Sequence, residues 1–168
     1  QQYTVEFILI DPATGSWPGE GLAVGISNKV TKPADSISHL KTTSRLPYII
    51  AAKEAKDQGW DDALLLNGRG TIAESTICNI FIVKNNSLYT PPLSDGGIAG
   101  VTRNYLLGQR TISGLNIEER SLDENDLNTA EEIFLVNAIR GVQPVVWFKD
   151  KTYGNNLSRN VFDLINAL

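Results

Sequence analysis

A lysine and a glutamate in the first half of the sequence have the types and setting to carry out chemistry together. Lys41 lies in the stretch HLKTTSRL, directly before a predicted helix and outside any run of charges. Most lysines lie on the surface, but a lysine removed from water has a lowered pKa and forms Schiff bases with carbonyl compounds. Glu74 lies among small residues where two predicted strands meet. It is either a solvated turn residue or a buried carboxylate that needs a partner.

The stretch GGIAGVTRNYLL, residues 96–107, has the composition of an anion-binding helix start. Small residues lead into a predicted helix that begins near Val101 and Thr102. Backbone N–H groups at such a start, together with the helix dipole and a hydroxyl group, bind anions such as phosphate. The stretch matches neither a P-loop nor the dinucleotide-binding fingerprint, and many helices follow glycine without binding an anion.

These three features together are the protein groups that pyridoxal 5'-phosphate requires. Lys41 would supply an amine for the aldehyde, and Glu74 a partner for the protonated ring nitrogen. Residues 96–107 would supply a cradle for the phosphate. Each feature alone is a weak signal, so the prediction depends on their combination.

The sequence contains few competing sites. His39 is the only histidine and Cys78 the only cysteine, so the sequence predicts neither a zinc site nor an internal disulfide. A Ser-His-Asp site would have to use His39, and the GxSxG stretch that presents such a serine is absent. His39 is therefore interpreted as a loop residue without a catalytic role, and Cys78 as a small core residue.

The composition is that of an ordinary globular protein. The chain has 168 residues, of which 42% are hydrophobic and 20% charged, enough for one domain with a real core. The net charge of −4 and the pI near 5.0 argue against nucleic acid as a partner, because binding to phosphates needs a basic surface. No apolar run approaches the roughly 20 residues of a membrane helix, and no leader resembles a signal peptide. We therefore expect no membrane partner and a cytoplasmic location.

The elements that must position these residues can be predicted from periodicity and turn signals. Pro47 suits the first turn of a helix and Gly59 its end, and Asn85-Asn86 suits a hairpin turn between two strands. Residues 29–44 lack a period and are predicted to form a loop. The predicted strands are 3–10, 22–27, 62–67, 79–84, 87–90, 115–119, 132–138 and 142–149, and the predicted helices are 46–59, 102–113, 122–130 and 156–168.

Strands and helices mix in this order without strict alternation. The predicted fold class is therefore α/β in the mixed, α+β sense, with a barrel-like mixed sheet and helices packed outside. The run DALLLN, residues 62–67, is apolar without interruption, which predicts a strand buried on both faces.

The sequence from Leu40 to Arg103 resembles the fold-type IV pyridoxal-phosphate enzymes, the class IV aminotransferase group. The matching text is LKTTSRLPYIIAAKEAKDQGWDDALLLNGRGTIAESTICNIFIVKNNSLYTPPLSDGGIAGVTR. The resemblance continues through IEERSLDENDL, AEEIFLVNAIRGVQPV and the C-terminal helix. It implies the large, C-terminal domain of the D-amino-acid-aminotransferase-like fold. The family's small N-terminal domain carries an arginine for the phosphate, and we expect residues 1–168 to be a single domain that lacks it.

The resemblance also implies roles for particular residues. Lys41 matches the Schiff-base lysine, Glu74 the partner of the pyridine nitrogen, and Asn79 a recurrent structural asparagine. The residues with expected cofactor contacts are Lys41, Glu74, Gly100, Val101, Thr102, Asn137 and Ala138. Arg140 is a candidate for binding a substrate carboxylate, although a surface arginine is the more common interpretation, and Arg45 is a second candidate for contact with the substrate.

Two short motifs separate the members of this family. Arg45-Leu46 and Asn137-Ala138 resemble the 4-amino-4-deoxychorismate lyases, whereas branched-chain aminotransferases have a tyrosine at the position of Leu46. The resemblance therefore favours a lyase that forms 4-aminobenzoate and pyruvate. An aminotransferase for branched-chain or D-amino acids is the alternative, and a truncated or inactive scaffold is the second. A small amino substrate and a homodimer are expected in either enzyme.

Overall fold

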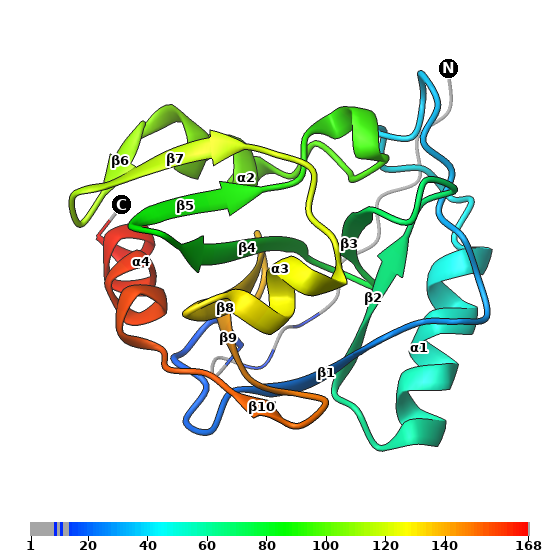
Figure 1. The fold of residues 1–168 in the computed structure, drawn as a ribbon, viewed down its shortest axis with the longest axis horizontal. Helices are drawn as coiled ribbons and strands as arrows, with labels where there is room; N and C mark the ends of the chain where they lie inside the picture. Colours follow the sequence, from blue (N-terminus) through cyan, green and yellow to red (C-terminus); the bar gives the residue numbers. More distant parts are fainter. Residues whose placement is uncertain (1–8, 10, 12–13, 168) are drawn as a thin grey trace.

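A large mixed sheet forms the frame of the protein (Figure 1). The computed structural model describes residues 9, 11 and 14–167. Within them the sheet has the order β3-β2-β1-β9-β8-β4-β5-β7-β6, and β10 pairs with β9. The strands are β1 (Leu22–Ile26), β2 (Asp62–Leu66), β3 (Ile72–Ser75), β4 (Asn79–Lys84), β5 (Ser87–Thr90), β6 (Thr111–Ile112), β7 (Leu115–Glu119), β8 (Glu132–Asn137), β9 (Gly141–Phe148) and β10 (Lys151–Thr152).

Helices cover the curled sheet from both sides. They are α1 (Leu46–Gln58), the short 3-10 helix η1 (Leu93–Asp95), α2 (Val101–Gly108), α3 (Glu124–Thr129) and α4 (Asn156–Asn166). α1 packs on β2, whereas α2 and α4 pack on β8 and its neighbours. α3 packs on the opposite face, which the curl makes concave (Figure 1). The predicted mixed, half-barrel sheet with outer helices is confirmed, with α3 as the exception that lies inside.

The central strands are buried on both faces. In β4, Ile80 and Ile82 belong to the core on the α3 side, while Phe81 and Val83 belong to the core under α2 and α4. β2 behaves in the same way: Leu64 faces α3, and its neighbours face α1. The uninterrupted apolar run of residues 62–67 predicted a strand buried on both faces, and β2 confirms this prediction.

Local signals explain most element boundaries. α1 has Pro47 in its first turn, and it ends at Gly59, whose φ of 76° is left-handed and therefore favours glycine. The hairpin between β4 and β5 turns at Asn85 and Asn86, with φ of 50° and 59°, as a tight two-residue turn requires. Residues 29–44 form a loop apart from a single bridge of Lys32 to Asn67. These predictions are confirmed.

Three short strands depart from the predictions. The helix predicted over 102–113 ends at Gly108, because Thr111–Ile112 pairs with β7 through a turn at Ser113 and Gly114. Both turn residues have positive φ, 52° and 82°, so the dipeptide forms a hairpin turn. β3 and β10 were not predicted, since strands of four and two residues carry little periodic signal. The strand predicted over 3–10 lies, except for residue 9, outside the described residues.

Candidate functional site

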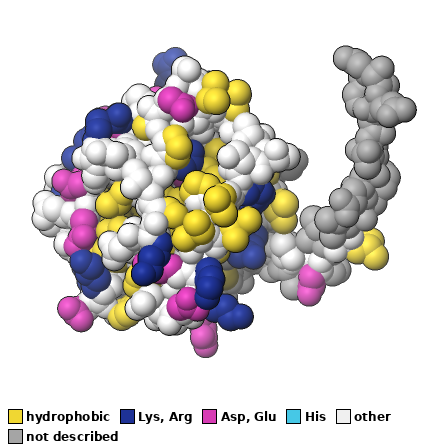
Figure 2. Space-filling view, turned by 90° about the vertical axis from the view of Figure 1, so that its right-hand side faces the viewer, with side chains coloured by type: hydrophobic (Ala, Val, Ile, Leu, Met, Phe, Trp, Pro, Cys, Tyr) yellow, Lys and Arg dark blue, Asp and Glu magenta, His cyan; other side chains and the backbone are white. Residues whose placement is uncertain are grey.

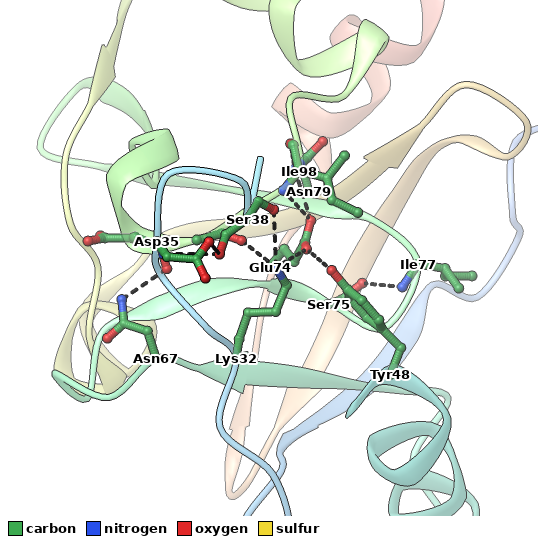
Figure 3. A network of polar contacts seen from close by, with 12 residues as sticks. Lys32, Asp35, Ser38, Tyr48, Asn67, Glu74, Ser75, Ile77, Asn79 and Ile98 are labelled. Carbon is green, nitrogen blue, oxygen red and sulfur yellow. Dashed lines mark hydrogen bonds and ion pairs between the residues drawn. The ribbon is translucent and has the colours of Figure 1, made fainter. Parts of the chain in front are cut away.

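Glu74 is a buried carboxylate on β3, only 3% exposed, and donors surround it (Figure 3). The Tyr48 hydroxyl donates to Oε1 at 2.7 Å. The Ile98 backbone N–H donates to Oε2 at 3.0 Å, and the Asn79 amide approaches the same oxygen at 3.4 Å. The prediction that Glu74 is a buried residue with polar partners, and not a solvated turn residue, is therefore confirmed.

A buried lysine stands beside this carboxylate. Lys32 Nζ lies 3.7 Å from Glu74 Oε1, and both side chains are almost inaccessible to water. The same ammonium donates to the carbonyls of Gly96 at 2.6 Å and Ser38 at 3.3 Å. A buried ion pair with these additional hydrogen bonds balances charges that would otherwise be unfavourable in the interior. Sequence analysis did not identify Lys32.

Burial and hydrogen bonding act on Glu74 in opposite directions. Removal from water is the largest influence and raises the pKa of the carboxyl above its usual value. The hydrogen bonds from Tyr48 and Ile98 and the charges of Lys32 and Lys41 lower the pKa, but by less in total. A ligand cation that bonded the carboxylate would add to these opposing influences and favour the ionised form.

Asn79 connects Glu74 to the glycine-rich loop before α2. Its amide donates to the Ile98 carbonyl at 2.9 Å as well as approaching Glu74. A Cβ on Gly100 would lie 2.1 Å from Asn79 Oδ1, and one on Gly97 would lie 2.8 Å from the Ala73 carbonyl. Glycine is therefore required at both positions, because the loop approaches β3 and β4 more closely than a side chain permits.

The start of α2 presents backbone N–H groups beside this loop. Gly100 is the N-cap residue with extended backbone, and no side chain caps the helix. The N–H groups of the first turn have no acceptor within the helix and carry the positive end of its dipole. Thr102 is buried, whereas Val101 is 76% exposed. This geometry fits the anion cradle predicted for residues 96–107.

Lys41 lies in the loop that runs past the same region. The Ala99 N–H donates to the His39 carbonyl at 2.9 Å, which ties this loop to the glycine-rich loop. Lys41 is near enough to lower the pKa of Glu74, although it is the smallest of the influences named above. The side chain of Lys41 is exposed in this chain, and among the described lysines Lys32 is the one that the fold buries.

A cavity of about 230 Å³ lies between the Lys41 loop and α1. Its walls come from three segments of the chain, and they include Lys32, Ser38, Leu40, Thr42, Tyr48 and Ile98. Glu74 is not among the residues that line it. A larger hollow of about 380 Å³ lies between Trp60 and Trp147. Neither lining includes Lys41, Glu74 or Thr102, but the smaller cavity adjoins the buried ion pair through Lys32, which belongs to its wall.

The remaining predicted residues lie farther from the cavity wall. Asn137 caps the turn between β8 and β9, where its Oδ1 accepts the N–H groups of Ile139 at 2.9 Å and Arg140 at 2.7 Å. Its amide also reaches the carbonyl of Ile77 at 3.3 Å, in the turn that follows Glu74. Ala138 and Arg140 are exposed. The hydrogen bond from Asn137 to Ile77 links this turn to the segment after β3.

Three further predicted residues have positions that limit their roles. Arg45 is exposed at the start of α1. Burial raises the pKa of the nearby Tyr48 phenol, and the charge of Arg45 opposes that rise. Cys78 is buried, and burial raises the pKa of its thiol to about 12, so it is an unreactive core residue as expected. His39 is half-buried, and its main chain makes the contact to Ala99.

Tyr48 and Lys32 are the site residues that sequence analysis missed. The ring of Tyr48 packs beside the core under α1, as an apolar residue of the predicted helix would. The sequence offered only indirect evidence for such partners, because a buried Glu74 requires hydrogen-bond donors and favours a cation nearby. Nothing in the local sequence around either residue identifies it as that donor.

The described part of the chain contains neither a membrane-spanning helix nor a metal-binding group of side chains. None of its helices has the length and apolar content to cross a membrane. Nor does any group of His, Cys, Asp and Glu side chains within it have the arrangement that holds a metal ion.

Comparisons with known proteins give a consistent family. The sequence profile of amino-transferase class IV matches residues 2–147. Branched-chain-amino-acid aminotransferase 6 of Arabidopsis thaliana is 40% identical over 114 residues, 65% of this chain and 32% of that protein. The aminodeoxychorismate lyase of Vibrio harveyi is 28% identical over 130 residues, 77% of this chain and 48% of that protein. The chain therefore spans less than half the length of these curated relatives.

A solved structure supports the same relationship. The crystal structure of the branched-chain amino acid aminotransferase of Thermobaculum terrenum, in its PLP form, has a TM-score of 0.80 and 25% sequence identity. The similarity covers 87% of this chain and 50% of that chain. The folds agree over nearly all of the described residues.

Proposed function

We propose, from the premise that this chain belongs to the amino-transferase class IV family, that the intact protein is a pyridoxal-phosphate enzyme acting on a small amino substrate. The family uses this cofactor, and a structural relative is described in its PLP form. The observation that carries the proposal is the buried Glu74 carboxylate, held beside a cavity and one loop away from an anion-binding helix start.

The described residues fit pyridoxal phosphate. When bound, the cofactor supplies an aldehyde that takes up an amine and a ring that withdraws electrons from the attached carbon. Glu74 would keep the ring nitrogen protonated, because a buried carboxylate favours a cationic partner. The N–H groups of Val101 and Thr102 and the Thr102 hydroxyl would bind the phosphate. Gly100 admits the close approach of the loop that these contacts require.

Lys41 would hold the cofactor and then move protons. Its side chain is exposed, so it is accessible both to the aldehyde and to a substrate amine. Once the substrate amine has replaced it, the free amino group of Lys41 would act as general base and then as general acid. Lys32 is not suited to this role, because its ammonium is held by the carbonyls of Gly96 and Ser38 and by Glu74.

For the reaction, we infer a lyase that converts 4-amino-4-deoxychorismate to 4-aminobenzoate and pyruvate. Leu46 stands where branched-chain aminotransferases have a tyrosine, and Arg45-Leu46 and Asn137-Ala138 resemble the lyase motifs. The relationship to the Vibrio harveyi lyase supports this choice. 4-Aminobenzoate is a folate precursor, so this enzyme would take part in folate synthesis.

An aminotransferase for branched-chain or D-amino acids is the second candidate. Its support is the higher identity to a branched-chain aminotransferase, 40% against 28% for the lyase, although over a shorter segment. The two candidates use the same Lys41 and Glu74, so the described site does not distinguish them.

We also propose that the intact enzyme is a cytoplasmic homodimer. Figure 2 faces the side of the molecule where α1 lies and shows hydrophobic side chains gathered there. The exposed hydrophobic residues on α1, the Lys41 loop and the start of α2 include Leu40, Leu46, Ile49 and Val101. Exposed apolar surface of this kind commonly marks a protein interface. Light scattering coupled to size exclusion would test the dimer, and a monomer at micromolar concentration would contradict it.

The reaction can be tested with the intact protein and two substrate sets. A lyase releases 4-aminobenzoate and pyruvate from 4-amino-4-deoxychorismate with no keto acid added. An aminotransferase leaves that compound unchanged and turns over amino acids only when a keto acid accepts the amino group. Lys41→Ala is the control, and we expect it to abolish turnover and the borohydride-fixed attachment of pyridoxal phosphate. A Lys41→Ala protein with normal turnover and attachment would refute the cofactor assignment.

A further inference from the structure

Lys32 is a buried lysine whose ammonium contacts three separate segments of the chain. Nζ donates to the Ser38 carbonyl at 3.3 Å, in the loop that carries Lys41, and to the Gly96 carbonyl at 2.6 Å, in the glycine-rich loop. It also lies 3.7 Å from Oε1 of Glu74 on β3. Figure 3 shows the side chain pointing at Glu74 and Ser38. An ammonium has three N–H groups, so these three acceptors can occupy all of them.

The backbone of Lys32 is fixed to the sheet, which gives the ammonium a defined position. Its N–H donates to the Leu66 carbonyl at the end of β2 at 2.8 Å, and the residue forms a parallel bridge with Asn67. The next residue, Pro33, lies so close to the glycine-rich loop that a Cβ on Gly96 would stand 2.3 Å from its carbonyl oxygen. Both loops are therefore joined to the sheet at Lys32.

The three segments that meet at Lys32 carry the groups of the candidate site. One loop continues from Ser38 to Lys41, and the other leads from Gly96 to the start of α2. The third segment is β3, which carries Glu74. A change in the direction of the Lys32 side chain would therefore alter the relative positions of all three.

The charge of Lys32 also acts directly on Glu74. The groups that face this carboxylate are the hydroxyl of Tyr48, the N–H of Ile98, the amide of Asn79 and the ammonium groups of Lys32 and Lys41. Burial is the largest influence and raises the pKa of the carboxyl, whereas both charges lower it. Lys32 has the larger effect of the two lysines. The ion pair therefore favours the ionised carboxylate against the effect of burial.

We propose that Lys32 is a positioning residue that joins the Lys41 loop, the glycine-rich loop and Glu74 into one site and favours the ionised form of that carboxylate. The inference rests on the proposed function, which requires an ionised Glu74 and an amine on the neighbouring loop. A buried ion pair can also be purely structural, and apolar side chains of similar volume often replace such a pair without loss of stability. A test must therefore separate the charge of Lys32 from the space that it fills.

Lys32→Met separates these two contributions in the intact protein, because methionine adapts to a similar space without a charge. We expect the Glu74 carboxyl of this variant to titrate at a higher pH than in wild type, since burial then acts without the opposing charge of Lys32. NMR titration of ¹³C-labelled glutamate carboxyls measures the change. The signal that Glu74→Gln removes identifies the residue, and the measurement needs no cofactor.

Turnover of the intact enzyme is the second readout. We expect kcat of Lys32→Met to fall about tenfold or more, because the loss of contacts to two loops displaces the groups that they carry. Lys32→Ala leaves space beside the cavity of about 230 Å³ that Lys32 lines, so added ethylammonium can take the place of the lost ammonium. It should restore part of the lost kcat, whereas ethanol, which is of similar size but neutral, should not.

Two further variants control for general effects and for folding. Lys29→Met removes an exposed lysine from the same loop, and should change neither the Glu74 titration nor kcat. Lys32→Gln is neutral but keeps N–H groups for the two carbonyls, and it should also raise the pH at which Glu74 titrates. It keeps the test valid if Lys32→Met folds poorly. Circular dichroism would verify the fold of each protein.

Several results would overturn the inference. A Glu74 carboxyl that titrates at the wild-type pH in Lys32→Met would show that the lysine does not favour its ionised form. An unchanged kcat in that variant would show that Lys32 does not position the site. Equal recovery of Lys32→Ala with ethanol would show that Lys32 only fills space. If wild type has no turnover that depends on pyridoxal phosphate, the proposed function fails, and the NMR titration still decides whether Lys32 favours the ionised Glu74.

Discussion

Two buried glutamates in the same sheet are held by different kinds of donor. Glu132, on β8, accepts hydrogen bonds from the first turn of α4. Its donors are the Leu157 N–H at 3.0 and 3.1 Å, the Ser158 N–H at 3.1 Å and the Ser158 hydroxyl at 3.1 Å. Glu74, on β3, accepts from the Tyr48 phenol and one backbone N–H, approaches the Asn79 amide, and pairs with the Lys32 ammonium.

The difference supports the proposal that Glu132 is a structural carboxylate and Glu74 a functional one. Glu132 caps α4 across the fold, where its charge also meets the positive end of the helix dipole. These donors belong to a regular helix and cannot rearrange without unfolding its first turn. Two of the groups around Glu74, on Lys32 and Tyr48, belong to side chains that line a cavity. Burial alone therefore does not distinguish the two carboxylates, whereas the kind of donor around each does.

Glu74→Gln should produce the largest effect, and on turnover. The neutral amide cannot keep the ring nitrogen protonated, so we expect kcat of the intact enzyme to fall by about a hundredfold or more. The amide is close in size to the carboxylate, so the fold should be retained. Steady-state kinetics and circular dichroism of the purified variant would measure both. An unchanged kcat with a raised KM would contradict the role of Glu74.

Glu132→Ala should act on stability and leave the site chemistry intact. Its removal leaves the first turn of α4 uncapped and a gap under Leu157 and Ser158. We expect a loss of about 2–3 kcal/mol in the free energy of unfolding. Urea denaturation would measure the loss. A stable Glu132→Ala protein with impaired pyridoxal-phosphate binding would reverse the roles assigned to the two glutamates.

The pH dependence of stability should show the smallest effect. The pKa of Glu74 is raised in the folded protein, so between its usual value and the raised one the folded state binds more protons than the unfolded state. The contribution of Glu74 to stability is therefore complete below pH 4.5 and is lost as the pH rises through the folded-state pKa.

A comparison of wild type with Glu74→Gln isolates this contribution. Because glutamine does not titrate, the stability of the variant relative to wild type should increase with pH, by at most about 1.4 kcal/mol per pH unit. Thermal unfolding between pH 4 and pH 8 would measure the difference. A constant difference would show that the Glu74 pKa is the same in the folded and unfolded states.

Much of the fold could be predicted because its signals are local. Pro47 and Gly59 bound α1, Asn85-Asn86 turns the β4–β5 hairpin, and the apolar run of β2 indicates a strand buried on both faces. The class of fold followed from the order of these elements. The predicted end of α2 was wrong, because Thr111–Ile112 pairs with β7 and does not continue the helix. That pairing is a contact between two strands, and the periodicity of a single segment does not reveal it.

The candidate site was predictable only in part. Lys41, Glu74 and the stretch 96–107 were identified from residue type and family resemblance, and the structure brings their loops together through the Ala99–His39 hydrogen bond. The exposure of Lys41 was not predictable, since it depends on how the loop 29–44 lies on the rest of the protein. Asn137 caps the turn between β8 and β9, and its amide reaches the Ile77 carbonyl in the turn after β3.

Local sequence was sufficient to indicate that Glu74 is unusual, because a carboxylate among small residues between two strands has to be either solvated or partnered. Only the tertiary structure selects its partners. Tyr48 is 26 residues away from Glu74 in the chain, and Lys32 belongs to a loop that precedes α1. Their side chains meet the carboxylate because α1 packs on β2 and β2 pairs with β3. A hydrogen bond or ion pair acts over a few ångströms in space, whereas sequence patterns record neighbours along the chain. These partners can therefore be identified only from the tertiary structure.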